Sequence, residues 1–342
     1  MPFMQFRYGR KSWRIEMDSK VKALAEKAIN QKSISEDDAK LLYEIGKVHP
    51  FMVFSYGSEI REHFKGKKIN LCCIINAKSG ICPENCRFCA QSAHYQTDAP
   101  VYPLLSASEI IKRAHEAKEW GAHFFSIVTS GTSIGSKEEW EEIYEAIQGI
   151  NALNIKPCGS LGMLSDEEAL ALKQAGLFRY HHNLETSRSY FHNICTTHDY
   201  QDDIETNKAA KRAGLSVCCG GIIGLGETME HRIEMAMTLK EIDVDSVPIN
   251  ILNPIPGTPL ESNPSLSPLE ILMTISLYRF ILPDKDIKLC GGKEKNLRQL
   301  LPLGIVAGCN SLMTGNYLTT TGREAAHDIE MIRDLGLEVA YE

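Results

Sequence analysis

Eight short apolar runs recur along the chain with helical segments between them, and this alternation limits the possible fold more than any other feature. The runs are Ile69–Ile75, His123–Val128, Ile155–Cys158, Arg179–Leu184, Leu215–Cys219, Ser246–Asn250, Ile287–Cys290 and Asn310–Met313. Strand-length runs that alternate with helices indicate βαβ units and a parallel sheet. Their span, from about Lys68 to Glu338, suits the roughly 250 residues of a (β/α)8 barrel. We therefore predict an α/β fold of this TIM-barrel type; a doubly wound open sheet is the alternative.

Local signals mark several helix ends. Ser106-x-x-Glu109 and Ser165-x-x-Glu168 read as capping boxes, and Gly176 should end the helix that begins after Ser165. Helices are also expected from about Asp18 to Lys47, with Ser33 or Ser35 as a cap, and over Pro268–Ile281 and Arg323–Leu335. The predicted organisation is an N-terminal helical extension, residues 1–67, followed by the barrel, residues 68–342.

Composition excludes several classes of protein. The net charge of −7 does not favour a nucleic-acid partner, and no apolar run approaches the roughly 18 residues of a membrane span. Eleven cysteines in 342 residues, with no secretory signal, indicate a reducing, cytoplasmic setting. The first sixteen residues are basic and aromatic, and we read them as a terminal extension rather than a transit peptide.

Three cysteines form the most specific chemical motif. Cys82, Cys86 and Cys89 follow the first predicted strand with the spacing Cys-x3-Cys-x2-Cys. Three thiolates on one short loop can hold three corners of a [4Fe–4S] cluster and leave the fourth iron open. A structural zinc site normally has four protein ligands, and the motif offers no fourth. The loop therefore predicts an iron–sulfur cluster with a free coordination position, at the end of a barrel where active residues gather.

This loop resembles that of the radical S-adenosylmethionine (SAM) superfamily, in which SAM chelates the open iron. The resemblance implies that Phe88 lies near the adenine of SAM. Gly220-x-Ile222-x-Gly224-x-x-Glu227 resembles the adenine-contacting segment of such barrels, and Ser130-Gly131 occupies the position that binds the methionine part.

A longer set of runs resembles the biotin synthase family. It comprises Cys82–Cys86, Gln91–Tyr95, Tyr180–Ser187, Val217–Ile222, Val247–Leu252, Pro256–Leu260 and Ala307–Ser311. The resemblance covers about Ile69 to Leu337. It implies that dethiobiotin is converted to biotin: a 5′-deoxyadenosyl radical made from SAM removes hydrogen, and an auxiliary iron–sulfur cluster donates sulfur.

The resemblance also assigns roles to individual residues. Asn183 and Asn250 would bind the ureido ring of dethiobiotin, since an amide supplies both a donor and an acceptor. Glu185 would bind the ribose of SAM, at a position where the family commonly has Asp. Thr320 and Thr321 would present backbone N–H groups to the substrate carboxylate. Three histidines, His181, His182 and His198, are read as packing or surface residues.

The ligands of the auxiliary cluster depart from the family pattern. The family uses three Cys and one Arg, but here Ser126 and Lys288 stand at one Cys position and at the Arg position. Lysine cannot copy arginine there, because its ammonium must lose a proton to bind metal. The barrel strands carry additional cysteines instead. We hypothesise a different auxiliary cluster, of the four-iron type, held by Cys72, Cys158, Cys218 and Cys290, with Cys309 or Cys219 as possible replacements.

Two other functions stay open at this point. One is a different radical SAM enzyme with a similar barrel, of the hydrogenase-maturation or methylornithine type. The other is a non-catalytic iron–sulfur protein that only binds SAM. For the biotin synthase reading, the resemblance implies an electron donor such as flavodoxin or ferredoxin, and a homodimer.

Overall fold

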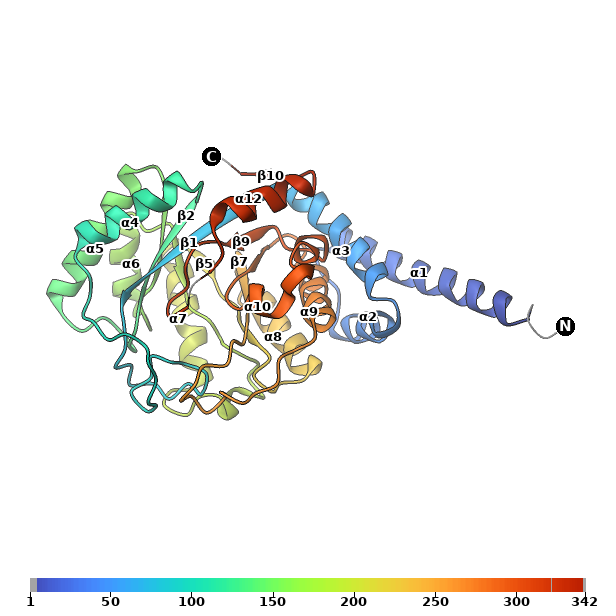
Figure 1. Ribbon diagram of the computed structural model, residues 1–342, viewed down its shortest axis with the longest axis horizontal. Coiled ribbons are helices and arrows are strands. Elements are labelled where there is room, and N and C mark those ends of the chain that lie inside the picture. Colours follow the sequence, from blue (N-terminus) through green and yellow to red (C-terminus); the bar gives the residue numbers. More distant parts are fainter. Residues whose placement is uncertain (1–4, 321, 341–342) are drawn as a thin grey trace.

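The computed structural model describes the backbone of residues 5–320 and 322–340, and the side chains from Trp13 onward within these ranges. Its centre is a closed parallel barrel with helices around it (Figure 1). Strands pair in the order β1-β2-β3-β4-β5-β7-β8-β9, and β9 pairs with β1 to close the ring. The predicted (β/α)8 barrel is therefore confirmed, and the open sheet is excluded.

Each of the eight apolar runs forms a strand of the barrel. The strands are β1 (Lys68–Lys78), β2 (Phe124–Thr129), β3 (Lys156–Ser160), β4 (Arg179–His181), β5 (Ser216–Cys218) with β6 (Gly221–Ile223), β7 (Ser246–Ile251), β8 (Asp286–Leu289) and β9 (Ser311–Met313). The fifth strand is broken between β5 and β6, and both parts pair with β7. A last short strand, β10 (Glu338–Val339), pairs with the start of β1.

The helices alternate with these strands and cover the barrel. They are α4 (Ala107–Glu119), α5 (Lys137–Ala152), α6 (Asp166–Ala175), α7 (Tyr200–Arg212), α8 (Met229–Glu241), α9 (Pro268–Ile281), α10 (Lys293–Leu297), α11 (Leu303–Val306) and α12 (Ala325–Asp334). The capping boxes at Ser106 and Ser165 are both formed. Gly176 ends α6 with φ 99°, a left-handed conformation that glycine adopts without strain.

Three helices precede the barrel. They are α1 (Gln5–Gln31), α2 (Glu36–Val48), which Ser35 caps, and α3 (Pro50–Lys65). α3 packs against α9, and α1 extends away from the barrel toward the N-terminus (Figure 1). The basic and aromatic segment 1–16 lies partly in α1; residues 1–4 fall outside the described residues. The division of the chain at residues 67 and 68 stays a prediction.

A buried arginine ties the barrel together at α9. The Arg279 side chain is fully buried, and its Nε donates to Gly308 O at 2.8 Å. Its other nitrogens donate to Pro283 O, Lys285 O and Asn310 Oδ1, each at 2.8 Å. The charge is thus satisfied by four acceptors on two segments, the connections that precede β8 and β9.

Among the described helices, none has both the length and the apolar character of a membrane span.

Candidate active site

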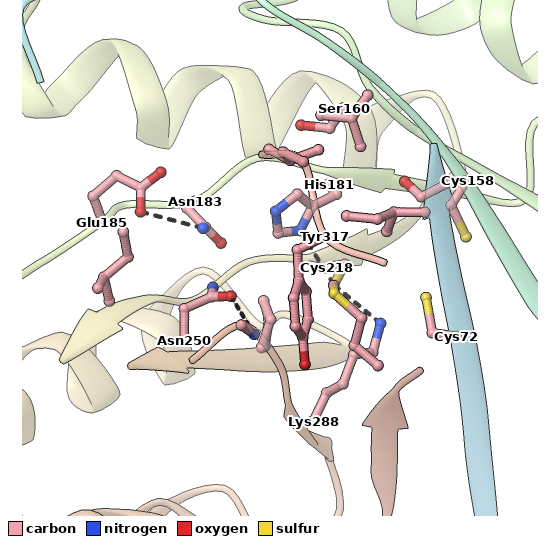
Figure 2. A pocket seen from close by; sticks show the side chains of 18 of the residues that line it. Cys72, Cys158, Ser160, His181, Asn183, Glu185, Cys218, Asn250, Lys288 and Tyr317 are labelled. Atoms are coloured by element: carbon pink, nitrogen blue, oxygen red, sulfur yellow. Dashed lines mark hydrogen bonds between the residues drawn. The ribbon is translucent and has the colours of Figure 1, made fainter. Parts of the chain in front are cut away.

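A cavity of about 310 Å³ occupies the inside of the barrel toward the C-terminal ends of the strands (Figure 2). Amide and carboxylate side chains gather at one end of it, and thiols with two cationic side chains at the other. Many of the side chains singled out in the sequence meet here: Phe88, Ser126, Glu185, Asn183, Asn250, Ile222, Thr320, Cys72, Cys158, Cys218 and Lys288. Such a cavity at this end of the strands is where a barrel enzyme carries its active site.

The three-cysteine loop leaves β1 and is folded back by its own backbone. Cys82 N donates to Gln91 O at 3.0 Å, Ala93 N to Cys82 O at 2.8 Å, and Cys89 N to Cys86 O at 2.9 Å. All three thiols are free. Three half-buried thiols on one short loop can supply the three sulfur ligands of a [4Fe–4S] cluster whose fourth iron stays open.

A polar clamp holds this loop from the other side of the barrel mouth, and sequence reasoning missed it. Glu84 Oε1 accepts from Thr132 Oγ1 at 2.5 Å, and Glu84 Oε2 lies 2.7 Å from His198 Nδ1. His198 Nε2 lies 3.5 Å from the buried Asp203, which also bonds to His182 Nε2 at 2.7 Å. Although burial opposes the charge, Asp203, Cys195 and Glu84 together raise the pKa of His198 to about 11. His182 and His198 therefore connect the cluster loop to α7 rather than acting as simple packing residues.

The amide end of the cavity is built on β4 and β7. Asn183 Oδ1 accepts from Gly220 N at 3.2 Å, and its Nδ2 donates to Glu185 Oε2 at 3.2 Å. Asn250 Nδ2 donates to Gly221 O at 3.3 Å, and its Oδ1 accepts from Gly291 N at 3.1 Å. An amide group has two N–H donors and two oxygen lone pairs. Each Asn thus keeps one donor and one acceptor for a ligand.

Glu185 lies beside these amides in an unusual state. Its backbone has φ 59°, a left-handed conformation that is uncommon for a residue with a side chain. Burial raises the pKa of its carboxyl to about 7, against the weaker opposite effects of His181 and Asn183. Perturbed carboxyl groups in a cavity are frequent at functional sites.

The break in the fifth strand places two glycines behind the amide end of the cavity. A Cβ on Gly220 would lie 2.1 Å from Pro248 O, and one on Gly221 would lie 2.4 Å from Glu185 O. Both approaches are too close for any side chain. The glycines let β4, β6 and β7 draw together, and the amides of Asn183 and Asn250 bond to this backbone as a result.

The thiol end lies deeper in the barrel. Cys72 and Cys158 pack with the Phe124 and Phe178 rings in a small buried cluster of their own. Cys218 Sγ lies 3.4 Å from His181 Nδ1 and 3.9 Å from Lys288 Nζ, both marked in Figure 2. His181 thus lines the cavity, contrary to the expectation of a packing or surface residue. The sequence prediction grouped it with His182 and His198, although it lies two residues before Asn183 and therefore on the same face of β4.

Charges at this end favour a thiolate. Burial alone would raise the pKa of Cys218, but Lys288, His181 and Arg179 together lower it to about 6. Burial raises the pKa of Cys158 to about 12. Arg179, which the sequence did not single out, lines the cavity and lies 3.6 Å from Asp286. Lys288 and Arg179 thus place positive charge beside several thiols, which favours binding of an anionic, sulfur-rich group.

The remaining candidates fall outside the cavity lining. Cys290 is fully buried, and burial raises the pKa of its thiol against the opposite effect of Lys288. Ser130 and Gly131 line a separate hollow at the cluster loop, and Ser130 Oγ donates to Gly80 O at 2.8 Å. Cys219 and Cys309 lie in the main hydrophobic core. Thr321 lies outside the described residues.

Comparisons with known proteins agree with this fold and site. The model of the radical SAM superfamily matches residues 77–239, and the Biotin and Thiamin Synthesis associated domain matches residues 248–338. A methylornithine synthase structure has a TM-score of 0.80 at 21% identity, over 93% of this chain and 97% of that one. A maturase of the [FeFe]-hydrogenase has a TM-score of 0.81 at 16% identity, over 100% and 80%. These structures show the fold alone; the family models, the barrel and the three-cysteine loop define a radical SAM enzyme.

Curated sequences narrow this class further. The chain is 52% identical to a biotin synthase of Geotalea uraniireducens, over 95% of this chain and 99% of the relative. It is 53% identical to a biotin synthase of Geobacter sulfurreducens, over 93% and 97%. The chain belongs to the biotin synthase family. Membership implies a [4Fe–4S] cluster, SAM and an auxiliary iron–sulfur cluster as cofactors.

Proposed function

We propose that this protein converts dethiobiotin to biotin by radical SAM sulfur insertion. The observation that carries the proposal is one cavity with a urea-compatible pair of amides at one end and a group of buried thiols at the other. The enzyme must hold an unreactive carbon between a radical source and a sulfur source. A closed barrel cavity does this by positioning the substrate and excluding water.

Cys82, Cys86 and Cys89 are proposed to hold the [4Fe–4S] cluster, which when bound supplies the electron that cleaves SAM. Phe88 and Ile222 line the cavity below this loop and offer apolar contact to an adenine. Glu185 is proposed to accept from the ribose hydroxyls. Ser130 and Gly131 are proposed to meet the methionine part, although they line the neighbouring hollow rather than the main cavity.

The two amides support binding of a urea-like ring. Asn183 and Asn250 each retain one donor and one acceptor after their bonds to the backbone and to Glu185. A cyclic urea offers N–H donors and a carbonyl acceptor, which match this supply. Thr320 and Thr321 are proposed to receive the carboxylate at the other end of dethiobiotin.

Cys72, Cys158, Cys218 and Cys290 are proposed to hold a four-iron auxiliary cluster that donates sulfur. Support comes from Cys72, Cys158 and Cys218, which line the thiol end of the cavity, and from the buried Cys290, whose Sγ lies 3.8 Å from Lys288 O. The substituted family ligands, Ser126 and Lys288, support it as well. The Lys288 ammonium lies 3.9 Å from Cys218 Sγ, and it is suited to neutralise the charge of a thiolate rather than to ligate a metal.

Anaerobic reconstitution with iron and sulfide counting and Mössbauer spectroscopy tests the ligand assignment. About eight irons per chain are expected, whereas about six would restore a two-iron auxiliary cluster and about four would leave only the SAM cluster. The double variant Cys158→Ala, Cys218→Ala should lose the auxiliary iron only. Cys73→Ala is the matched control, because it removes a buried thiol of the main hydrophobic core that is not a ligand candidate. Unchanged iron in the double variant would refute the assignment.

The reaction itself is tested by adding SAM, a reductant and dethiobiotin to the reconstituted protein. Biotin and 5′-deoxyadenosine should both form. 5′-Deoxyadenosine without biotin would indicate another radical SAM reaction, and neither product would indicate a binding protein. The physiological reductant is proposed to be a flavodoxin or ferredoxin, and the enzyme a cytoplasmic homodimer.

A further inference from the structure

Tyr317 lies at the boundary between the two ends of the cavity. Its ring lines the cavity together with Leu318, Thr319 and Thr320. In the view of Figure 2 the ring stands between Asn250 and the pair formed by Cys218 and Lys288. A Cβ on Gly291 would lie 3.2 Å from Asn250 Oδ1 and 4.0 Å from Tyr317 Cδ1. Because glycine leaves this space open, the ring lies next to the amide end of the cavity.

A buried ion network fixes the phenol of Tyr317. Its hydroxyl donates to Glu294, with Oε1 at 2.7 Å, and accepts from Lys293 Nζ at 3.0 Å. The Lys293 side chain has an exposed fraction of 0%, so the protein must satisfy its ammonium. Lys293 Nζ also donates to Met313 O at 2.6 Å and lies 3.8 Å from the buried Asp328. The ring is thus tied at once to α10, to the end of β9 and to α12.

The same network fixes the turn that carries the proposed carboxylate site. Tyr317 N donates to Thr320 O at 3.0 Å, so residues 317–320 form one tight turn. Leu318 O accepts from Asn76 Nδ2 at 3.1 Å. This bond joins the turn to β1, shortly before that strand leads into the three-cysteine loop. A turn with a polar anchor at its first side chain and another at its backbone has little freedom to shift.

We propose that Tyr317 is a positioning residue, whose ring packs against the hydrocarbon part of the substrate and is held there by Lys293 and Glu294. The inference rests on the proposed function. In this proposal, the carbons that must react lie in the middle of the cavity, between the amide end and the thiol end. A fixed aromatic wall restricts those carbons to one path between the radical and the sulfur.

Three variants test the proposal in the reconstituted enzyme. Tyr317→Ala removes the ring, and Tyr317→Phe keeps the ring but removes its bonds to Lys293 and Glu294. Tyr56→Phe is the matched control, since the Tyr56 hydroxyl bonds to Asp18 on α1, far along the chain from the cavity residues. Iron content and thermal unfolding of each variant identify any variant that fails to fold or to load its clusters.

The measured quantities are the dissociation constant of dethiobiotin, by calorimetry, and the ratio of 5′-deoxyadenosine to biotin formed. Tyr317→Ala should weaken dethiobiotin binding about tenfold and raise the product ratio, because a misplaced carbon lets the radical be quenched elsewhere. Tyr317→Phe should bind within about threefold of the wild type yet still raise the ratio. Tyr56→Phe should change neither quantity.

If a folded, fully loaded Tyr317→Ala enzyme matches the wild type in both quantities, the proposal is wrong. The same holds if Tyr317→Phe leaves the product ratio unchanged, because the ion network would then have no positioning role. Either result would leave the proposed function intact, since the wild-type enzyme in the same experiment still makes biotin. Absence of biotin from the wild type would refute the proposed function instead.

Discussion

Ionisation of Glu185 should make the cluster-free protein less stable as the pH rises. Burial raises the pKa of this carboxyl from 4.5 to about 7 in the folded state. At 1.36 kcal/mol per pKa unit, ionising it in place disfavours the fold by about 3 kcal/mol. The side chain lines a cavity that water can enter, so screening lowers this to about 1–3 kcal/mol. The stability is fully present below pH 4.5 and is lost as the pH rises through about 7.

Urea denaturation of the cluster-free protein under anaerobic, reducing conditions at pH 5 and pH 8 measures this effect. Between the two pH values the wild type should lose about 1–3 kcal/mol more unfolding free energy than Glu185→Gln, which keeps an acceptor for Asn183 without the charge. Glu167→Gln on the exposed face of α6 is the matched control and should follow the wild type. Equal pH dependence in the wild type and Glu185→Gln would show that burial of this carboxylate has no such cost.

Three further changes test other parts of the framework. Tyr180→Phe removes a buried hydroxyl that donates to Gly162 O at 2.5 Å, and urea unfolding should show a loss of about 1–3 kcal/mol. Arg279→Met removes the donor to Gly308 O, Pro283 O and Lys285 O, while Asn310 Oδ1 keeps its bond from Ile287 N, and the thermal transition should fall by the equivalent of about 3 kcal/mol. Gly220→Ala forces a methyl group against Pro248 O, and calorimetry should detect loss of dethiobiotin binding even in the fraction that folds; normal binding would contradict the close approach described here.

The barrel could be predicted because its signals are local. Each strand run, such as Ser246–Asn250, is apolar enough to be recognised alone. Ser106 and Ser165 mark the starts of their helices, because each is followed three residues later by a glutamate that completes a capping box. α3 was not anticipated, although Pro50 at its first turn is a favourable start for a helix. Its apolar pattern is interrupted by Gly57, where a Cβ would lie 2.5 Å from Ala307 O.

The site was predictable only where a motif or a strand position carries the information. Asn183, Asn250 and the inward cysteines follow from their strands and from the family resemblance. The Glu84–His198–Asp203 clamp joins residues more than a hundred positions apart along the chain. No local sequence pattern predicts such a contact, because it forms only when the folded barrel brings the loop after β1 against the loop after β4. The same applies to Lys293 and Tyr317.

The glycine backbone at the break in the fifth strand also bears on how this cavity could be redesigned. Gly220 and Gly221 form the backbone to which the amides of Asn183 and Asn250 bond, and no larger residue fits at either position. These two positions therefore offer an engineer nothing to vary. New substrate range would have to be sought in the turn of residues 317–320, which lines the cavity. A library confined to that turn would explore shape while leaving the amide geometry at Asn183 and Asn250 untouched.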